Sequence, residues 1–559
     1  MNLHKFVSDS IKEKLAVLNT DLSNVTIEIP KIREHGDFST NAAMVLAKPL
    51  GQSPRDIANM ILPHIAALPF VADTSIAGPG FINIKLKDEF ILESINHKSE
   101  IINQKSQIID LDYGGYNIGK DLHIGHLRTT VVGDTFNRIA KHLGHKTKSY
   151  NHMGDWGRPM GLIIAWILEH GMPTDADEIN KMYPASTTRA NEDPEWMERA
   201  KKITAELQNG NPEYRKIYDT FAPMSLGRID DILARLNILP FDENRGERLV
   251  AEYIPEFEKV LIAKNLIVTD DGAEIIPVKL NTDNAPMPPI MWRSSAGAQT
   301  YAAADLTAVY YRMRTDNPTD IIYFTDSRQN LHFTQVFRAS RLAGFDNVNL
   351  QHIGYGAVTG ADGKPFKTRD GGVASLIGVL DLSVESVQKR VAESGKNLPD
   401  ETIQAIALAA LKFNDLMHDV KSDYIFDADA ITSFEGRTGP YILYTAVRLN
   451  SILKRVGAHT CAQGVCNTPL QSDERNLLLT ILDFNRIINT AFDRRATDML
   501  ANYTYDLCQS INTFYHNCPI LRDDVDTATR AHRIAIVQKS LETLSIAIDL
   551  MGLKIPDEM

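Results

Sequence analysis

The sequence predicts an α/β protein in which a parallel-sheet domain with a helical insertion lies between a small α+β domain and an all-α bundle. Apolar runs typical of buried strands alternate with helical patterns from residue 108 onward, which favours a parallel sheet. A polar, helix-rich segment interrupts this alternation, and toward the C-terminus apolar residues recur at spacings of three and four. The expected domains are residues 1–107, 108–380 with an insertion at about 170–290, and 381–559.

Composition and charge narrow the functional classes. The 559 residues are 43% hydrophobic and 23% charged, as in an ordinary soluble globular protein, and no apolar run approaches the ~20 residues of a membrane span. A formal net charge of −12 excludes a broadly basic surface, so contacts with nucleic acid would depend on local patches. Four cysteines are few for this length and are typical of a reducing compartment, so we expect a cytoplasmic protein.

The cysteines leave one alternative open. All four lie near the C-terminus, and two histidines are close to them in sequence: Cys461, Cys466, Cys508, Cys518, His459 and His516. Their spacing does not match the usual zinc-ligand patterns. We therefore expect free thiols and no protein-held metal, with a zinc site as the less favoured interpretation.

The first domain begins with an amphipathic helix, because apolar residues repeat at helical spacing from residue 3 to residue 18. A Gly-Pro-Gly turn separates two expected strands, residues 71–77 and 81–86. Phe81 and Asn83 are two apart and therefore share one face of the second strand. An aromatic ring and an amide on an exposed face can stack on and hydrogen-bond an unpaired base, although a solvated face with one buried Phe fits at least as well.

The central domain is organised around residues 117–126, Asn-Ile-Gly-Lys-Asp-Leu-His-Ile-Gly-His. A strand pattern precedes this run and a helical pattern follows it, so the run lies where an open α/β sheet forms its ligand crevice. His123 and His126 share one face of the first helical turn, whose N–H groups suit a phosphate. Gly125 would let a flat base or sugar approach the backbone. On its own, the pattern is explained more simply by two solvated histidines.

Two further segments carry candidate side chains. Tyr301 and Asp305 begin a helical pattern, and because they are four apart they face the same way. A glycine-flanked loop at residues 360–372 follows a predicted strand and carries Lys364 and Lys367. A mobile cationic loop is suited to hold a polyphosphate as charge moves in a transition state, and the alternative is a solvated surface turn.

Several separated motifs together resemble one family. Residues 117–126 resemble the HIGH motif of class I aminoacyl-tRNA synthetases, and Lys364-Pro365-Phe366-Lys367-Thr368 resembles their KMSKS motif. The other motifs are similar to those of arginyl-tRNA synthetases and cover essentially the whole chain: Gly36-Asp37-Phe38-Ser39, Gly78-Pro79-Gly80-Phe81-Ile82-Asn83, Asn117 with Lys120, Asn151-His152 with Gly154-Asp155-Trp156-Gly157, Tyr301 with Asp305, Arg328-Gln329-Asn330-Leu331-His332, and Gly439-Pro440-Tyr441 with Tyr444 and Arg448. The resemblance implies a Rossmann-like catalytic domain between an N-terminal tRNA-contacting domain and a C-terminal anticodon-binding domain.

The sequence departs from the family pattern around the central run. Gly114-Gly115-Tyr116 stands where the family usually has Ser-Pro before the asparagine, and Gly119 stands where Ala is usual. Arg158-Pro159-Met160 replaces the frequent Thr-Gln-Phe, and segment 283–298 is unusual. We therefore expect an unusual loop shape at the amino-acid pocket and unchanged overall chemistry.

The resemblance implies ATP-dependent activation of L-arginine, with Mg²⁺, and transfer of the arginyl group to the terminal adenosine of tRNA(Arg) by a monomer. The implied catalytic residues are His123, His126, Lys120, Lys364 and Lys367. The implied ATP-binding residues are Gly125, His123, His126, Lys364 and Lys367. No protein nucleophile is needed, so positioning and charge stabilisation would carry the catalysis.

Recognition of arginine requires carboxylates in the plane of a guanidinium, because bidentate pairing rejects lysine geometrically. The expected arginine-binding residues are Asp305 as the leading candidate, Asp112 as the second, and Tyr301, Gln329 and Asn117. The expected tRNA-contacting residues are Phe81, Asn83, Tyr441, Tyr444 and Met559. The competing hypotheses are a class I synthetase for another amino acid and a non-catalytic tRNA-binding paralogue.

Overall fold

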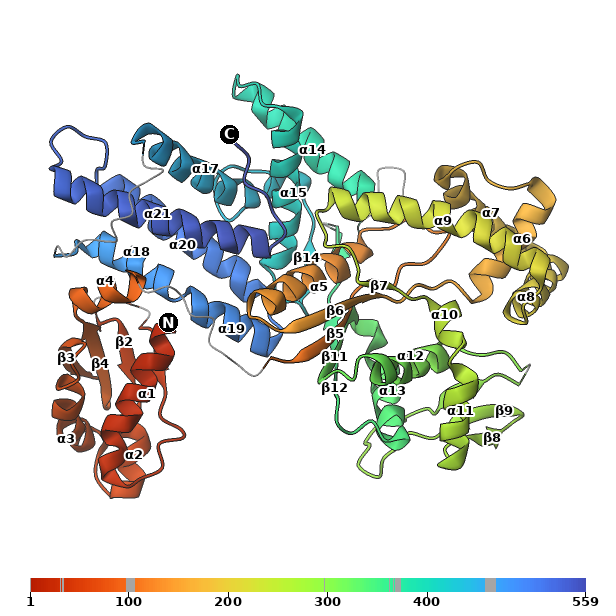
Figure 1. Cartoon of the computed structure of the whole chain (residues 1–559), viewed down its shortest axis with the longest axis horizontal. Helices are drawn as coiled ribbons and strands as arrows, with labels where there is room; N and C mark the ends of the chain where they lie inside the picture. Colours follow the sequence, from red (N-terminus) through yellow and green to blue (C-terminus); the bar gives the residue numbers. More distant parts are fainter. Residues whose placement is uncertain are drawn as a thin grey trace. The chain divides into compact units, whose positions relative to one another are not determined.

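The computed structural model describes residues 2–30, 32, 35–96, 106–295, 297–360, 362–364, 366, 374–457 and 469–559. The chain divides into two compact units, which are described separately (Figure 1). The sheet unit comprises Lys105–Pro440 and Leu550–Lys554. The terminal unit comprises Met1–Gln104, Tyr441–Asp549 and Ile555–Met559.

The sheet unit is built on a five-stranded sheet in the order β12-β11-β5-β6-β7. Its strands are β5 (Ile108–Asp112), β6 (Lys146–Asn151), β7 (Glu243–Asn244), β11 (Asp320–Asp326) and β12 (Asn349–Tyr355). All four pairings are parallel, which confirms the predicted sheet. The chain moves outward from β5 to β7 and then returns to the other side of β5 with β11. The order therefore reverses between β5 and β11, and a ligand crevice is expected at their carboxyl ends.

Helices connect these parallel strands, as a parallel sheet requires. The relevant elements are α5 (Gly125–His142), α6 (Arg158–His170), α12 (Tyr301–Thr315), η3 (Ser327–Gln329) and α13 (Asn330–Ala343). α5 contacts β5, β6 and β11. One apolar cluster packs Val309 of α12 and Phe333 of α13 with Ile321 of β11. This core fixes α12 and α13 relative to the strand that ends at the crevice.

Within the sheet unit, a second apolar cluster packs the insertion against α6 and the central run. Its elements are α7 (Ala176–Glu192), α8 (Pro194–Gln208), α9 (Pro212–Arg235), α10 (Glu247–Ala251), α11 (Ile254–Ala263), β8 (Val268–Asp270), β9 (Ala273–Ile276) and β10 (Ile290–Arg293). Trp196, Tyr218 and Phe221 are buried in this cluster with Ile118 of the central run, so these aromatic side chains belong to the core. The region is not helical throughout, since β8, β9 and β10 form an antiparallel sheet.

The sheet unit continues beyond residue 380. Its remaining elements are β13 (Val358–Thr359), α14 (Leu376–Glu393), α15 (Asp400–Leu416), β14 (Tyr424–Ile425) and α16 (Ala428–Ile431). Arg128 of α5 forms a fully buried ion pair with Asp415 of α15, at 3.0 Å. The Arg128 guanidinium also donates to the carbonyls of Ser422 and Gly356, at 2.6 and 3.2 Å. These bonds join the helices after residue 380 to the first crossover helix.

The N-terminal part of the terminal unit is the predicted α+β fold. Its elements are α1 (Leu3–Leu15), η1 (Ala16–Leu18), β1 (Ile27–Glu28), β2 (Phe38–Thr40), α2 (Ala42–Leu50), α3 (Pro54–Ala66), β3 (Val71–Ala77), β4 (Phe81–Leu86) and α4 (Asp88–Asn96). The sheet is antiparallel, in the order β1-β2-β4-β3. β4 is therefore an inner strand, and Asn83 on it is only 8% exposed. The expectation that Asn83 lies on an exposed sheet face is wrong, because both faces of β4 are covered at Ile82, Asn83 and Ile84.

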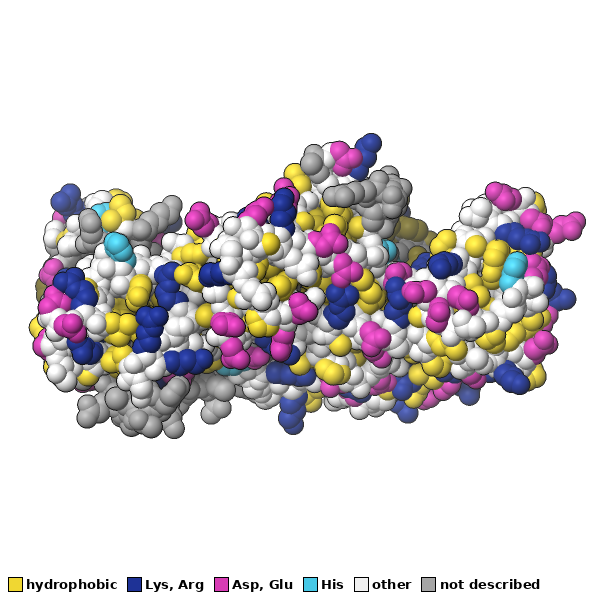
Figure 2. Space-filling view, turned by 90° about the horizontal axis from the view of Figure 1, so that it is seen from above, with side chains coloured by type: hydrophobic (Ala, Val, Ile, Leu, Met, Phe, Trp, Pro, Cys, Tyr) yellow, Lys and Arg dark blue, Asp and Glu magenta, His cyan; other side chains and the backbone are white. Residues whose placement is uncertain are grey.

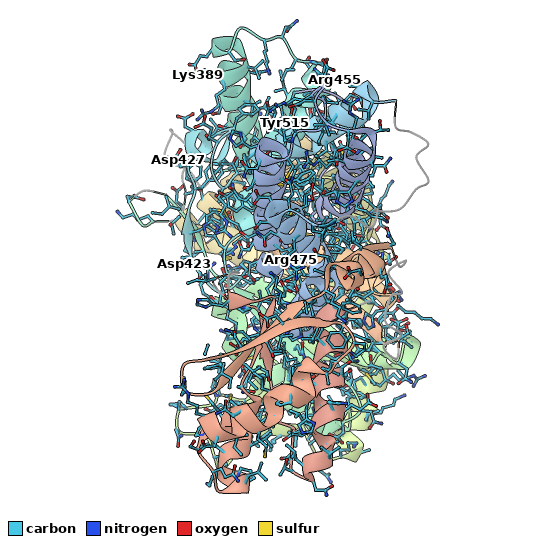
Figure 3. All side chains as sticks on the ribbon, turned by 90° about the vertical axis from the view of Figure 1, so that its left-hand side faces the viewer. Lys389, Asp423, Asp427, Arg455, Arg475 and Tyr515 are labelled. Carbon is cyan, nitrogen blue, oxygen red and sulfur yellow. The ribbon has the colours of Figure 1, made fainter. Side chains whose placement is uncertain are left out.

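The C-terminal part of the terminal unit is helical, as predicted. It contains α17 (Gly439–Arg455), which begins in the sheet unit, and α18 (Ser472–Leu482), α19 (Phe484–Arg494), α20 (Asp498–Asn517) and α21 (Thr527–Leu550). Arg475 of α18, labelled in Figure 3, forms ion pairs with Asp37 and Asp88 and donates to the Leu86 carbonyl at 2.8 Å. One buried guanidinium therefore ties the helices to the N-terminal fold.

Candidate active site

The central run leaves β5 through a loop that requires glycine at one position. Gly119 has φ +77°, and a Cβ there would lie 2.3 Å from Ile163 Cδ1. Its N–H donates to Ser225 Oγ of α9 at 2.9 Å. Alanine would be strained in this backbone conformation and would collide with Ile163. The departure from the family pattern at Gly119 therefore has a local structural cause.

The two histidines of the run are held by the backbone. The Nδ1 atom of His126 accepts a hydrogen bond from the His123 N–H at 3.0 Å, and Nδ1 of His123 accepts one from the Gly125 N–H at 3.1 Å. The ring centroids are 4.0 Å apart. Because each Nδ1 is an acceptor, each neutral ring carries its proton on Nε2 and can donate from there. A Cβ on Gly125 would lie 2.8 Å from the His123 ring, so the glycine makes room for it.

Both histidines are neutral near pH 7. Burial, and next the neighbouring His123, lower the pKa of His126 to about 3. Burial, and then the positive charges of Lys120 and Arg328, also lower the pKa of His123. The pair therefore presents two uncharged N–H donors at the start of α5, where helix N–H groups already favour an anion.

The lysine loop returns directly to the central run. The Ile124 N–H donates to the Ala374 carbonyl at 3.0 Å, and the Leu376 N–H donates to the Leu122 carbonyl at 2.8 Å. His123 thereby lies opposite Ser375 in a short antiparallel bridge. The structure thus brings the far end of the loop beside the histidines, although the two motifs are distant in sequence.

Of the two loop lysines, only Lys364 lies among the described residues. Lys364 is exposed, and its N–H donates to Asp362 Oδ1 at 3.1 Å in a turn. Phe366 anchors the loop by an edge contact with the Phe426 ring, with centroids 4.9 Å apart. Lys367 lies outside the described residues.

Lys120 faces the insertion. Its Nζ lies 4.4 Å from the centroid of the Tyr183 ring of α7. The next residue, Asp121, pairs with Arg228 of α9 at 3.1 Å. Lys120 thus has a partner that holds its side chain against α7.

A second group of charged side chains is centred on Asp305, in the first turns of α12. His152, in the loop after β6, places Nε2 3.3 Å from Asp305 Oδ1. His332 of α13 places Nε2 2.6 Å from Asp305 Oδ2. Burial alone would raise the pKa of Asp305, but the two imidazoles hold it well below its usual range. Burial alone would lower the pKa of His152, but the Asp305 carboxylate, followed by the charge of Asp112, raises it to about 9.

Asp112 is paired with a guanidinium of the protein itself. Arg312, seven residues after Asp305 on α12, donates from Nη2 to Asp112 Oδ2 at 2.5 Å, and both side chains are buried. The Arg312 guanidinium also lies 4.3 Å from the centroid of the Tyr150 ring. Of the two carboxylates considered for a substrate guanidinium, Asp305 remains partly accessible, whereas Asp112 already has a cationic partner.

The other predicted amino-acid residues come from the start of α12 and from two further segments. Tyr301 begins α12, is 64% exposed, and has its ring 5.0 Å from that of His332. Gln329 is exposed at the end of η3, directly after β11. Asn117 is half-buried and bridges to Gly154, where a Cβ would lie 2.3 Å from the Asn117 amide oxygen.

Sequence reasoning missed three side chains that shape this group: His152, His332 and Arg312. The sequence predicts no role for His152 and His332, which occur only as members of longer motifs, and none for Arg312. The available signal for Arg312 was its position two helical turns after Asp305 on the same helix face. No sequence signal connects either histidine to Asp305, because the contacts join different elements.

The predicted tRNA-contacting residues lie in the terminal unit. Phe81 is half-buried on β4. The hydroxyl of Tyr441 accepts from Asn512 at 2.7 Å and from Gln509 at 3.0 Å. Tyr444 has the Arg448 guanidinium 4.7 Å from its ring centroid, and Met559 is half-buried.

The cysteines and possible metal ligands can be assessed only in part. Cys508 and Cys518 are buried free thiols, while Cys461, Cys466 and His459 lie outside the described residues. Where the structure describes the chain, it shows no group of three His, Cys, Asp or Glu side chains placed to bind a metal. Over the same residues, none of the helices combines the length and apolar character needed to cross a membrane.

Two features define the catalytic domain of a class I aminoacyl-tRNA synthetase. A His-Ile-Gly-His run lies on the first crossover of a parallel sheet, and the backbone of this run is bonded to the returning end of a lysine loop. A family model described as "tRNA synthetases class I (R), catalytic domain" matches residues 89–428. The arginyl-tRNA synthetase N-terminal domain model matches residues 2–86, and the DALR anticodon-binding domain model matches residues 442–559.

Whole-chain comparisons agree with these domain matches. The chain is 35% identical to the arginine–tRNA ligase of Alkaliphilus oremlandii, covering 93% of this chain and 94% of that protein. It is 32% identical to the arginine–tRNA ligase of Ectopseudomonas mendocina, with 96% and 95% covered. Thermus thermophilus arginyl-tRNA synthetase has the same fold, with a TM-score of 0.85 over 100% of both chains at 23% identity. The chain belongs to the arginyl-tRNA synthetase family.

Proposed function

We propose that this chain activates L-arginine with ATP and transfers the arginyl group to the 3′-terminal adenosine of tRNA(Arg). The observation that carries the substrate assignment is the Asp305 carboxylate, which is ionised and held between two imidazoles at the carboxyl edge of the sheet. A fixed anion in this position can form the bidentate pair that a guanidinium prefers. Tyr301, Gln329 and Asn117 would border the rest of the amino acid. Asp112 would be kept in place by its hydrogen bond from Arg312.

In the first step, a carboxylate oxygen of arginine attacks the α-phosphorus of ATP, and pyrophosphate leaves. The protein supplies no nucleophile, so its contribution is positioning and stabilisation of the charge that builds on the phosphate oxygens. Nε2 of His123 and of His126 would donate to these oxygens as neutral groups. Gly125 would let ATP approach the backbone.

Lys364 and Lys367 would hold the β- and γ-phosphates, and Lys120 would add positive charge near the run. Mg²⁺ bound with ATP would add further positive charge to the phosphates. The lysines and Mg²⁺ would together balance the negative charge that the leaving pyrophosphate gains.

In the second step, a ribose hydroxyl of the terminal adenosine, the 2′-hydroxyl by analogy with class I enzymes, attacks the arginyl carbonyl and releases AMP. Phe81 and Asn83 would contact a loop base of the tRNA, and Tyr441, Tyr444 and Met559 would border the anticodon. Because Asn83 is only 8% exposed, its contact with a base would be limited to the small part of its side chain that solvent reaches. On the face that Figure 2 draws, basic side chains are interspersed with acidic ones. With a formal net charge of −12, contacts with tRNA would depend on local patches. A cytoplasmic monomer remains the prediction.

The test is pyrophosphate release by the full chain with ATP and bulk tRNA, measured with each amino acid in turn. The proposal predicts release that depends on arginine and is accompanied by arginyl-tRNA. Release with a different amino acid would favour a synthetase of other specificity. No release with any amino acid would favour a tRNA-binding paralogue.

A further inference from the structure

We propose that His152 is a positioning residue for the substrate: it holds Asp305 in the free protein and gives up a proton when the guanidinium of L-arginine binds. This inference rests on the proposed function, because it names the group that the substrate displaces. It adds a specific exchange, one cation for another, to the assignment of Asp305.

The geometry shows that the Asp305 carboxylate is occupied on both sides. Oδ1 faces Nε2 of His152 at 3.3 Å, and Oδ2 faces Nε2 of His332 at 2.6 Å. The two contacts differ, since His332 is within hydrogen-bonding distance and His152 forms a longer ion pair. A guanidinium that needs both carboxylate oxygens can therefore displace His152 more readily than His332.

The charges around His152 explain why it holds a proton in the free protein. The charged groups that act on it are Asp155 of its own loop, Glu247 of α10, Asp112 of β5, and Asp305 and Arg312 of α12. His332 of α13 contacts the other oxygen of Asp305. Arg312 and Asp112 pair with each other. Burial raises the pKa of Glu247 to about 7 and also raises that of Asp155. Asp305 is the carboxylate in ion-pair contact with the imidazole, and it contributes most to the raised pKa of His152.

Other bonds already hold Asp155 in place. Its carboxylate accepts from the Tyr218 hydroxyl at 2.8 Å and from the Arg248 N–H at 3.0 Å. His152 thus depends on Asp305 for its counter-charge, and the two groups act as one ionised pair in the absence of substrate. The pKa of His152, about 9 in this environment, agrees with the geometry.

Binding of arginine would replace this pair with another. Two guanidinium N–H groups would donate to the Asp305 oxygens, the His152 contact would break, and the imidazolium would release one N–H proton to the buffer. One positive charge enters and one leaves, so the buried site keeps its net charge. Retaining both cations would leave one of them without a counter-ion, which costs several kcal/mol in a buried site.

The exchange also contributes to specificity. A neutral side chain of similar length cannot replace the imidazolium charge, so Asp305 would remain paired with His152. A lysine ammonium brings the charge but lacks the planar fork that can occupy both oxygens. His152 would thereby exclude uncharged amino acids, whereas the shape of the carboxylate pair would exclude lysine.

The experiment compares kcat/KM for arginine and for ATP in tRNA charging between pH 6 and 8.5, in the full chain. In the wild type, kcat/KM for arginine should rise with pH, by up to about tenfold per unit, since the protonated form of His152 competes with the substrate. kcat/KM for ATP, measured at saturating arginine, should change much less. Over this range the guanidinium of arginine keeps its charge.

Two glutamine variants make matched controls, because glutamine offers an N–H donor near the position of Nε2 but does not titrate in this range. H152Q should lose most of the slope for arginine and exceed the wild type at pH 6. H332Q should retain the slope. Calorimetric titration with arginine in two buffers of different ionisation enthalpy should show release of nearly one proton in the wild type and nearly none in H152Q.

The inference is overturned if kcat/KM for arginine is as flat as that for ATP in the wild type. It is also overturned if H152Q keeps the wild-type slope, or if only H332Q loses it. Failure of the proposed function has a different signature, because the wild type would then not charge tRNA with arginine at any pH. Circular dichroism of each variant checks that the fold is retained, and an unchanged KM for ATP in H152Q would exclude simple misfolding.

Discussion

The histidine group proposed to bind the phosphates (the phosphate end) and the Asp305 group proposed to bind the amino acid (the amino-acid end) are built from opposite kinds of polar group. At the phosphate end, His123 and His126 are neutral rings whose Nδ1 atoms are satisfied by backbone N–H groups, which leaves each Nε2 to donate. At the amino-acid end, Asp305 is an ionised carboxylate already paired with two imidazoles, and Asp112 is paired with Arg312.

This difference follows from what each end would bind. A triphosphate brings its own negative charge and metal ion, so fixed neutral donors can stabilise it without a buried charge in the free protein. A guanidinium must meet an anion, and an unpaired buried anion would be costly before the substrate arrives. Temporary pairing with imidazoles avoids this cost, and it makes the amino-acid end sensitive to pH and to single charge changes.

The largest effect should come from Asp305→Asn. The amide cannot balance the charge of a guanidinium. kcat/KM for arginine should therefore fall on the order of a thousandfold, mainly through KM, which corresponds to a loss of about 3–5 kcal/mol in stabilisation. KM for ATP should remain nearly unchanged. Charging kinetics with each substrate varied in turn provide the measurement, and an equal rise of both KM values would remove Asp305 from the amino-acid end.

His123→Ala should have the next largest effect and should act at the opposite end. Removal of one donor to the developing phosphate charge should lower kcat by about a hundredfold, with little change in KM for arginine. His123→Gln retains a donor and should recover part of the loss. Arginine-dependent pyrophosphate release, followed before steady state, measures this step. Wild-type turnover in the alanine variant would exclude a role for His123.

Arg312→Lys should have a moderate effect that reaches the amino-acid end indirectly. Lysine keeps the charge beside Asp112 but loses the planar contact with Tyr150, so the free energy of unfolding should fall by about 1–2 kcal/mol. Urea unfolding measures this loss. KM for arginine should rise severalfold and KM for ATP should not, whereas a larger rise for ATP would contradict the separation of the two ends.

The smallest effect should be the response of kcat to pH at saturating substrates. Because burial lowers the pKa of His126 to about 3, this ring stays neutral as pH falls from 8 to 6, and the lowered pKa of His123 also favours its neutral form. Protonation of His126 would begin only as pH approaches its pKa of about 3. kcat should therefore change by less than about threefold over this range. A steep loss of kcat below pH 7 would mean that a histidine at the phosphate end is protonated there.

The phosphate end was largely predictable from the sequence. The run that contains His123 and the loop that contains Lys364 each follow a strand pattern, and parallel strands present such loops at one edge. The structure confirms the sheet and shows the backbone bonds between Ile124 and Ala374 that join the two motifs. The roles of the named side chains remain predictions.

The amino-acid end was less predictable because its contacts cross between elements. Asp305 followed from its spacing to Tyr301, but the pairing of Asp305 with His152 depends on how α12 packs over β6. The burial of Asn83 was missed for a similar reason, since alternation along β4 identifies two faces but does not say that both are covered. The strand β8 was missed because it is short, mostly polar and exposed.

The most direct test of the central claim compares L-citrulline with L-arginine in the wild type and in Asp305→Asn. Citrulline has nearly the same length and planarity as arginine but a neutral urea group. The ratio of its inhibition constant to KM for arginine therefore measures how much of the binding depends on the positive charge. The charge-paired amino-acid end predicts a ratio on the order of a thousand in the wild type and about ten or less in the variant. A ratio that is the same in both proteins would contradict the account.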